Sequence, residues 1–298
     1  MTDIMKHNIP VKSLDVTLLR TFVVAAEQSS MTAAGKILNL TQGAVSQQIA
    51  RLESTFGCKL FVRDSRGLRL TAMGERLIGR ARALLDLNDD IWTEMNGRIV
   101  GGRVRLGVPV DLMGTMLPPA LRTFSERYPQ VDLSLTSGSS PALVAALKRG
   151  ELDIALTEEP VDQPEGECLA IDRLVWVGAQ AGRAHTAIPL PISVASETCT
   201  FRPTVLDALR RDGRRWRTVF ENGSLEATVA TVRADLAITA SLMSTVAGDL
   251  TILDGNAGLP KLPAFAITLH LRPGDARPAV SEFAAQLRST FMDSRVRT

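Results

Sequence analysis

The sequence predicts a multidomain α+β protein: an N-terminal winged helix-turn-helix, a long linking helix, and a C-terminal α/β part built from two lobes. Three observations lead to this prediction. Residues 31–56 fit two helices joined by a tight turn, residues 72–96 contain no proline, and apolar runs alternate with helical patterns after residue 102. A chain of 298 residues with 45% hydrophobic residues is long enough to bury two or three separate cores.

The N-terminal segment predicts three helices that share one core. Apolar residues at helical spacing indicate the first helix over about 18–26. The second helix, over 31–38, has an apolar face made of Ala33, Ala34, Ile37 and Leu38. Residues 39–41 interrupt that pattern. The third helix begins at residue 42, and its apolar stripe consists of Val45, Ile49, Leu52 and Phe56.

The opposite face of the third helix carries groups that can bind DNA. Amide, hydroxyl and guanidinium groups pair with base edges and phosphates in a major groove, which accommodates one helix. On this face they belong to Gln42, Ser46, Gln47 and Arg51. An ordinary solvated helix also places polar residues opposite an apolar stripe, so this face alone favours neither interpretation.

The residues that follow favour the DNA-binding interpretation. Residues 59–63 and 68–70 indicate two short strands joined by a segment of hairpin-turn composition, and therefore predict a wing with a basic tip. Residues 1–72 hold nine Lys and Arg against five Asp and Glu, while the rest of the chain holds 25 against 27. The positive charge thus lies where contacts with phosphate would need it.

As a set, these motifs resemble those of the LysR-type transcriptional regulators. The resemblance is carried, in the expected order, by Leu-Arg-Thr-Phe at 19–22, Ala-Ala at 33–34, Thr-Gln-Gly-Ala-Val-Ser-Gln-Gln-Ile at 41–49, Leu-Glu at 52–53, Leu-Phe-Val-Arg at 60–63 and Leu-Thr-Ala-Met-Gly at 70–74. It extends at lower density over almost the whole remaining chain. It implies a winged helix-turn-helix DNA reader joined by a long helix to a ligand-sensing domain.

The resemblance also gives roles to single residues. The candidate DNA contacts are Thr32, Gln42, Ser46, Gln47, Arg51, Arg63 and Arg66. The resemblance implies that the two glutamines and the serine face the major groove of double-stranded DNA. The threonine and Arg51 would contact mainly the DNA backbone, and Arg66 at the tip of the wing would enter the minor groove.

The predicted linker at 73–100 separates the DNA-binding domain at 1–72 from the effector-binding domain at 101–298. Its apolar residues form one seam of Leu77, Ala81, Leu84, Asn88, Ile91 and Met95 and a second stripe of Ile78, Leu85 and Trp92. We expect this helix to pair with a second copy in a homodimer, whose twofold symmetry would match an inverted-repeat promoter site. The alternative is that both stripes pack against the chain's own domains. The resemblance further implies a homotetramer.

The C-terminal part predicts strands that alternate with helices, and therefore a parallel sheet. Strands are expected near 103–108, 131–135, 152–156, 188–194, 217–220, 236–239 and 265–271, and helices near 117–127, 143–149, 203–211, 225–233 and 279–291. This order resembles the family's two-lobed sensor, which is similar to periplasmic binding proteins. Lobe I would cover about 101–176 and 264–298, and lobe II about 177–263, with crossovers near Val177 and Pro263.

Ligands of open α/β sheets bind beyond the carboxyl ends of strands, so an unidentified small-molecule effector is expected between the lobes. A serine-rich loop before a helix offers hydroxyls and backbone amides to an anion or carboxylate, with Arg202 as a candidate counter-charge. Ser, Asn and Asp also cap helices, so each residue alone has a structural explanation. The candidate effector contacts are Pro109, Val110, Asp111, Ser137, Gly138, Ser139, Thr157, Trp176, Phe201, Arg202 and Asn222.

A narrower resemblance is to the branch of the family that includes LrhA and HexA. It is carried by Pro-Val-Asp at 109–111, Trp176, Cys-Thr-Phe-Arg at 199–202 and Trp-Arg at 216–217. It implies that Cys199 and Arg202 lie near the sensor cleft. A redox role for Cys199 is the alternative to a buried unreactive thiol, which we favour because reactive cysteines need an electropositive, accessible setting.

Other classes of function have little support in the sequence. The three histidines lie far apart, and no nucleophile elbow, phosphate-binding loop or pair of metal ligands occurs, so we expect no enzymatic activity, metal or cofactor. The three cysteines are widely spaced, which argues against a disulfide framework. Without an apolar run of roughly 20 residues or a secretion signal, the sequence predicts no membrane association and a cytoplasmic location. The alternatives are a cytoplasmic solute-binding protein or an enzyme with a two-lobed α/β domain.

Overall fold

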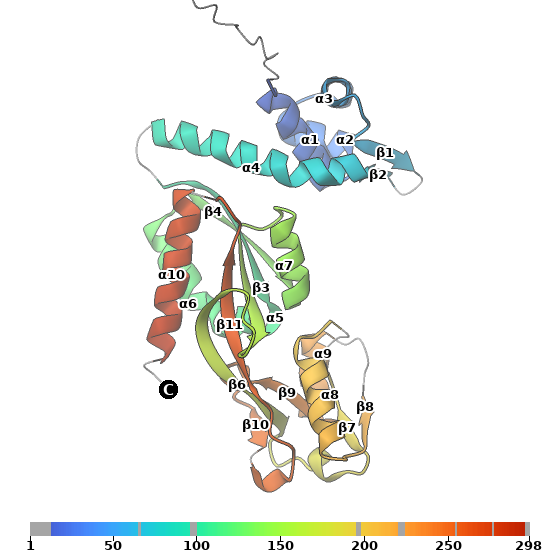
Figure 1. Cartoon of the computed structure of the whole chain (residues 1–298), viewed down its shortest axis with the longest axis vertical. Coiled ribbons are helices and arrows are strands. Elements are labelled where there is room, and N and C mark those ends of the chain that lie inside the picture. The colour runs from blue at the N-terminus through green and yellow to red at the C-terminus, as the bar shows by residue number, and fades with distance from the viewer. Residues whose placement is uncertain are drawn as a thin grey trace, which may run out of the picture. The chain divides into compact units, whose positions relative to one another are not determined.

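The computed structural model describes residues 13–64, 67–95, 100–194, 198–219, 224–253, 255–275 and 277–295 (Figure 1). The chain divides into two compact units, Met1–Ile91 and Trp92–Thr298. Among the helices described, none combines the length and the apolar character needed to cross a membrane.

The first unit contains three short helices, a hairpin and most of a long helix. In chain order these are α1 (Val16–Gln28), α2 (Met31–Leu38), α3 (Gln42–Phe56), β1 (Phe61–Asp64), β2 (Gly67–Leu70) and α4 (Ala72–Met95). Strands β1 and β2 pair antiparallel, with Phe61 opposite Leu70. The predicted helices, the break after Leu38, the wing and the long helix are therefore confirmed.

One hydrophobic core holds the first unit together. Its most buried members include Leu19, Phe22, Val45, Ile49 and Leu52. The ring centroids of Phe22 and Phe61 lie 5.4 Å apart, which connects α1 to the wing. The predicted apolar faces were wrong at the ends of two helices: Ile37, near the end of α2, is 55% exposed, and Phe56, the last residue of α3, is 39% exposed.

The apolar residues of α4 lie in two different environments. Ile78, Ala81 and Leu85 are buried in the core of the first unit. For these three, packing against the chain's own domain is the correct interpretation. Farther along the helix, four large apolar side chains are more than half exposed: Leu87, Ile91, Trp92 and Met95. Arg20 on α1 donates two hydrogen bonds to the carboxylate of Asp89, which lies in the last third of α4, and both side chains of this pair are partly exposed.

The second unit alternates strands and helices, as predicted, and adds elements that the sequence did not indicate. Its strands are β3 (Gly102–Pro109), β4 (Val131–Gly138), β5 (Ile154–Pro160), β6 (Glu167–Ala179), β7 (Leu190–Ile192), β8 (Trp216–Thr218), β9 (Thr239–Leu242), β10 (Leu250–Leu253) and β11 (Ala264–Leu271). Its α-helices are α5 (Val110–Thr115), α6 (Leu117–Arg127), α7 (Ser140–Lys148), α8 (Phe201–Arg211), α9 (Leu225–Arg233) and α10 (Pro278–Arg295). The short α5 and the strands β6 and β10 were missed.

The main sheet has the strand order β10-β6-β11-β5-β3-β4, and β9 also pairs with β6. Strand β3 is parallel to β4 and β5, but β11 is antiparallel to β5 and β6. The expected all-parallel sheet was wrong because β11 re-enters lobe I from the opposite end. Helices α6 and α10 cover one face of this sheet and α7 covers the other (Figure 1).

Strand β6 belongs to both lobes. Its first half pairs with β11, and its second half pairs with β9 and β10, so one continuous strand of 13 residues passes between the lobes. Val177 already pairs with Thr239 in lobe II. The predicted crossover near Val177 thus falls within this strand. The predicted crossover near Pro263 falls just before β11, and the Pro263 carbonyl accepts a hydrogen bond of 3.2 Å from the N–H of Leu174.

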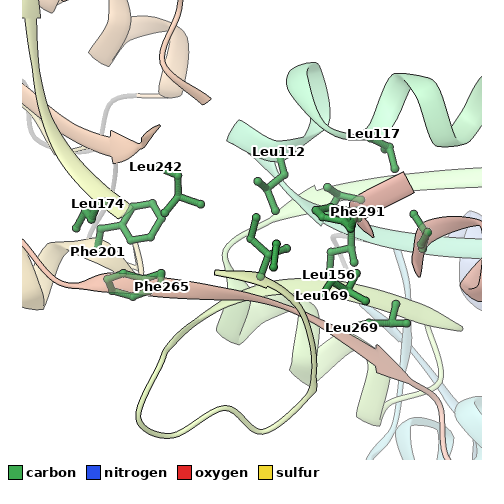
Figure 2. Close-up of a cluster of buried hydrophobic side chains, with 14 of the residues drawn as sticks. Leu112, Leu117, Leu156, Leu169, Leu174, Phe201, Leu242, Phe265, Leu269 and Phe291 are labelled. Atoms are coloured by element: carbon green, nitrogen blue, oxygen red, sulfur yellow. The ribbon is translucent and has the colours of Figure 1, made fainter. Parts of the chain in front are cut away.

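The main hydrophobic core of the second unit extends through both lobes, and a smaller cluster lies around Leu143 and Leu147. Figure 2 shows its labelled side chains in two groups, one around Phe201 and Phe265 and the other around Leu156 and Phe291. The rings of Phe201 and Phe265 meet edge to face, with centroids 4.9 Å apart. Phe201 begins α8 in lobe II and Phe265 lies near the start of β11 in lobe I, so this contact joins the two lobes.

Asp153, just before β5, is the centre of a buried ionic cluster. Its side chain is fully buried and accepts hydrogen bonds from the backbone N–H and the guanidinium of Arg105. Arg277 lies 2.5 Å and Arg272 3.4 Å from the same carboxylate. Asp275 bridges these two arginines. Burial alone would raise the pKa of Asp275, but hydrogen bonds and charge from Arg277 and Arg272 lower it to about 2.

Candidate DNA interface and ligand cavity

The turn between α2 and α3 fixes the position of the third helix. Asn39 ends α2 in the left-handed conformation with φ of 55°, and the N–H of Leu40 donates a 2.8 Å hydrogen bond to the carbonyl of Gly35. A Cβ at Gly35 would lie only 2.6 Å from the Leu40 oxygen, so this turn requires glycine. The Thr41 hydroxyl then accepts a hydrogen bond from the N–H of Ala44 and caps α3.

The predicted DNA-contacting face of α3 is accessible. Gln42, Gln47 and Arg51 are exposed and Ser46 is half-buried, while the opposite side of the helix is in the core. Thr32 is exposed in the first turn of α2. The backbone of Arg63 lies in β1, but its side chain and the whole of Arg66 lie outside the residues that the structure describes. The polar side chains of α3 thus lie opposite the buried part of its apolar stripe, which is Val45, Ile49 and Leu52.

Glu53 on α3 holds the base of the wing. Its carboxylate is 9% exposed and accepts hydrogen bonds from the Nζ of Lys59 at 2.6 Å and from the N–H of Leu60 at 2.9 Å. Burial acts to raise the pKa of Glu53, but the hydrogen bonds from Lys59, Leu60 and Phe61 outweigh it and lower that pKa below its ordinary value. Sequence reasoning placed Glu53 in the family motif but gave it no role.

Glu53→Gln is therefore expected to lower the melting temperature of the first unit near neutral pH. Because the folded state lowers the pKa of Glu53, its ionised form stabilises the fold above the ordinary value of 4.5 and loses that effect as the pH falls. The difference in melting temperature between Glu53→Gln and the native chain should shrink as the pH is lowered from about 7 to about 3, as measured by circular dichroism. Lys59→Gln is the matched variant for Glu53→Gln, because it removes the lysine but leaves the hydrogen bonds from the N–H groups of Leu60 and Phe61 to the Glu53 carboxylate in place. An equally large difference at every pH would contradict the ionic contribution.

A cavity of about 420 Å³ lies where the carboxyl ends of β3 and β4 face lobe II. Residues from the start of α5, the loop before α7, the start of α8, the start of α9 and strand β9 line it. Its volume is within the range of small-molecule sites. Seven of the predicted effector contacts line this cavity: Pro109, Val110, Asp111, Ser137, Gly138, Ser139 and Phe201.

Three predicted effector contacts lie elsewhere, and a fourth is not described. The hydroxyl of Thr157 is buried against Thr268, at 2.6 Å. The indole N–H of Trp176 donates a 2.8 Å hydrogen bond to the carbonyl of Pro260. Arg202 is half-buried in α8 but is not among the lining residues. Asn222 lies outside the described residues.

Glu158 lines the cavity but is not among the effector contacts predicted from the sequence, which include its neighbour Thr157 instead. Successive side chains of a strand point to opposite faces, so when Thr157 turns to β11, Glu158 turns to the cavity. Its own backbone N–H donates a 2.9 Å hydrogen bond to the Ser140 hydroxyl at the start of α7.

The carboxyl groups of Asp111 and Glu158 are neighbours in the cavity wall, and each affects the pKa of the other. Burial raises the pKa of Glu158 well above its ordinary value, and the neighbouring Asp111 raises it further. Burial likewise raises the pKa of Asp111, although its hydrogen bond with Glu158 acts in the opposite direction. Burial also raises the pKa of the Cys199 thiol beside them, with both carboxyl groups adding to the effect. This environment favours the unreactive interpretation of Cys199.

Comparisons with known proteins identify both halves of the chain. Residues 16–75 match a family described as bacterial regulatory helix-turn-helix protein, lysR family, and residues 98–292 match the LysR substrate binding domain. The HTH-type transcriptional regulator DgdR of Burkholderia cepacia is 34% identical over 280 residues, which are 94% of this chain and 95% of that protein. The fold is similar to that of ArgP from Mycobacterium tuberculosis, with a TM-score of 0.71, 20% identity and coverage of 94% and 98% of the two chains. It is also similar to CbnR complexed with its target DNA, with a TM-score of 0.61, 20% identity and coverage of 93% and 100%.

Proposed function

The chain belongs to the LysR family of bacterial helix-turn-helix proteins, and on that basis we propose how it reads DNA and how a ligand controls it. It is a DNA-binding transcriptional regulator with a C-terminal effector-binding domain. Members of this family are regulators and not enzymes, so the alternatives of an enzyme and of a solute-binding protein are set aside. The names of these relatives do not specify the LrhA and HexA branch, which stays a prediction.

In our proposal, the outward face of α3 enters the major groove of duplex DNA. The observation that carries this proposal is the exposure of Gln42, Gln47 and Arg51 on a helix whose opposite side is buried. Gln42, Ser46 and Gln47 would contact base edges, while Thr32 and Arg51 would contact phosphates. Arg63 and Arg66 on the wing would add contacts with the DNA backbone and the minor groove. The fold shared with CbnR, which has been solved with its target DNA, supports this orientation.

We propose that two copies pair through the exposed end of α4. Leu87, Ile91, Trp92 and Met95 present apolar surface along this end, and a second copy of the same helix would bury it. Such a pair would set two recognition helices on an inverted repeat. Two dimers joined into a homotetramer complete the proposed assembly. Because its target is promoter DNA, the protein would act in the bacterial cytoplasm.

The proposed effector site is the 420 Å³ cavity between the lobes. A ligand that contacts α5 in lobe I and α8 in lobe II would change the angle between the lobes and thereby DNA affinity or DNA bending. Effector and DNA must then affect each other's binding reciprocally.

The DNA proposal is tested by pairing two variants of α3. The full chain would select an operator from a randomised duplex library, and affinities would be measured for that operator and its single-base variants. Gln47→Ala should relax discrimination at one base pair by about 1–3 kcal/mol, because its amide would make a bidentate contact. Arg51→Ala should weaken binding to all sequences and reduce the salt slope by about one.

The two variants are each other's controls, since both side chains are exposed and neither belongs to the core. Equal loss of affinity across all sequences for Gln47→Ala would show that the recognition face is wrongly placed. Operator selection without any sequence preference would contradict the proposal as a whole.

A further inference from the structure

The charges in the wall of the cavity are all of one sign. Among the described residues that line it, the charged types are Asp111, Glu158 and Glu226, and no Lys, Arg or His is present. Arg202, which was expected to meet an anionic ligand, does not line the wall. An anion placed beside Asp111 and Glu158 would therefore face like charge without a basic side chain in the described wall to offset it.

Two polar atoms of this wall are buried without a hydrogen-bond partner. One is Oε1 of Glu158, a residue that is only 5% exposed, and the other is the hydroxyl oxygen of Thr200. Both residues line the cavity. A buried acceptor without a donor costs free energy, and that cost is removed when a ligand supplies the donor. The backbone of Glu158 is held at this position by the hydrogen bond from its N–H to the Ser140 hydroxyl.

The two carboxyl groups are also poised to change their protonation. Four titratable groups line the cavity: Asp111 on α5, Glu158 on β5, Cys199 before α8 and, at an exposed position, Glu226 on α9. Burial raises the pKa of both Asp111 and Glu158, which disfavours the ionised form of each carboxyl group in this wall. A cation beside them would favour the ionised forms, so binding of a cation would be coupled to loss of any proton that the two groups hold.

We propose that the effector of this regulator carries a protonated amine, which donates hydrogen bonds to Glu158 and Asp111 at the lobe I side of the cavity. The proposal rests on the proposed function, because it takes this cavity to be the effector site. The Thr200 hydroxyl is the third polar group within the same wall. The apolar part of the ligand would lie against Phe201 and Leu225.

The amine is tested with two sets of small probes that share a skeleton and differ in charge. One set is pentylamine, pentanol and pentanoate, and the other is phenethylamine, phenylethanol and phenylacetate. Melting temperatures of the full-length protein near neutral pH should rise with amines and stay unchanged with the alcohols and acids. Calorimetric titration of the better amine, in two buffers of different ionisation enthalpy, should show release of a proton on binding.

Glu158→Gln should weaken amine binding by about 30-fold or more, which is the effect expected when one partner of a buried charged hydrogen bond is lost. It should also abolish the proton release. Glu126→Gln, on an exposed position of α6, is the matched control and should bind the amine like the native chain. If Glu158→Gln melts at a much lower temperature than the native chain, Asp111→Asn takes its place.

Stabilisation by the acids and not by the amines would overturn the proposal, and so would the absence of stabilisation by any amine. Unchanged amine affinity in Glu158→Gln and Asp111→Asn would overturn it as well. None of these outcomes touches DNA binding, which is measured separately by titrating the ligand-free protein with its selected operator. Loss of that binding would count against the proposed function instead.

Discussion

Asp153→Ala is expected to destabilise the second unit by about 3–5 kcal/mol, because it removes the carboxylate that three arginines share. Asp153 is fully buried, and its loss removes a buried carboxylate from beside Arg105, Arg272 and Arg277. For a unit of this size the melting temperature should fall by about 10 °C. The change is measured as the melting of the full chain followed by circular dichroism.

Glu151→Ala is the matched control for Asp153→Ala. Glu151 lies two residues away and also pairs with an arginine, Arg149, but both side chains of that pair are more than a third exposed. An exposed pair contributes about 1 kcal/mol or less, so this variant should melt close to the native chain. Equal effects of the two variants would show that the buried cluster contributes no more than an ordinary surface pair.

Gly35→Val is expected to disrupt the helix-turn-helix. Its Cβ would meet the backbone oxygen of Leu40 at 2.6 Å, and a backbone atom cannot move aside as the tip of a flexible side chain can. Relieving the contact must shift the turn that positions α3. We expect a loss of stability in the first unit of about 2–3 kcal/mol. Operator affinity should fall at least about tenfold, because a shifted α3 must return to its binding position at a free-energy cost, and about 1.4 kcal/mol corresponds to tenfold in affinity.

Gly43→Ala is the matched control on the neighbouring helix. A Cβ at Gly43 would meet only the Thr41 hydroxyl, at an ordinary distance of 3.9 Å. Alanine is also the better helix former, so melting should occur at the same temperature or higher. Normal melting and operator binding by Gly35→Val would contradict the proposed requirement for glycine.

The N-terminal fold could be predicted almost to the residue because its signals are local. Ser30 and Thr41 cap their helices, and the chain between them carries a clear apolar spacing. The exposure of Ile37 and Phe56 could not be predicted in the same way. Helical spacing shows which residues lie on the same face of a helix, but not how far the neighbouring elements extend along that face to cover it.

The topology of the second unit was harder to predict because it depends on pairings between distant segments. Strand β6 lies in a stretch that carries charged residues, and it is stabilised by β11 and β9, which come about 70–100 residues later. The antiparallel direction of β11 likewise follows from the return of the chain from lobe II. Neither signal is present in a local window of sequence.

The ligand cavity was placed correctly at the level of loops and less well at the level of side chains. The ends of β3 and β4 were identified because small and polar residues follow the strands. At the end of β5 the prediction chose Thr157 over Glu158, since the sequence does not reveal which of two successive residues in a buried strand points outward. Because of this difference of one position, the prediction places a neutral hydroxyl at a point of the cavity wall where the structure has a carboxyl group.

Phe201 connects the ligand cavity to the packing between the two lobes. Its ring forms part of the cavity wall and also touches Phe265 at the start of β11, where the chain returns from lobe II. A ligand that displaced this ring would also change its packing against the start of β11. Substitution of Phe201 would uncouple the sensing of a ligand from the response to it, even where the ligand still binds.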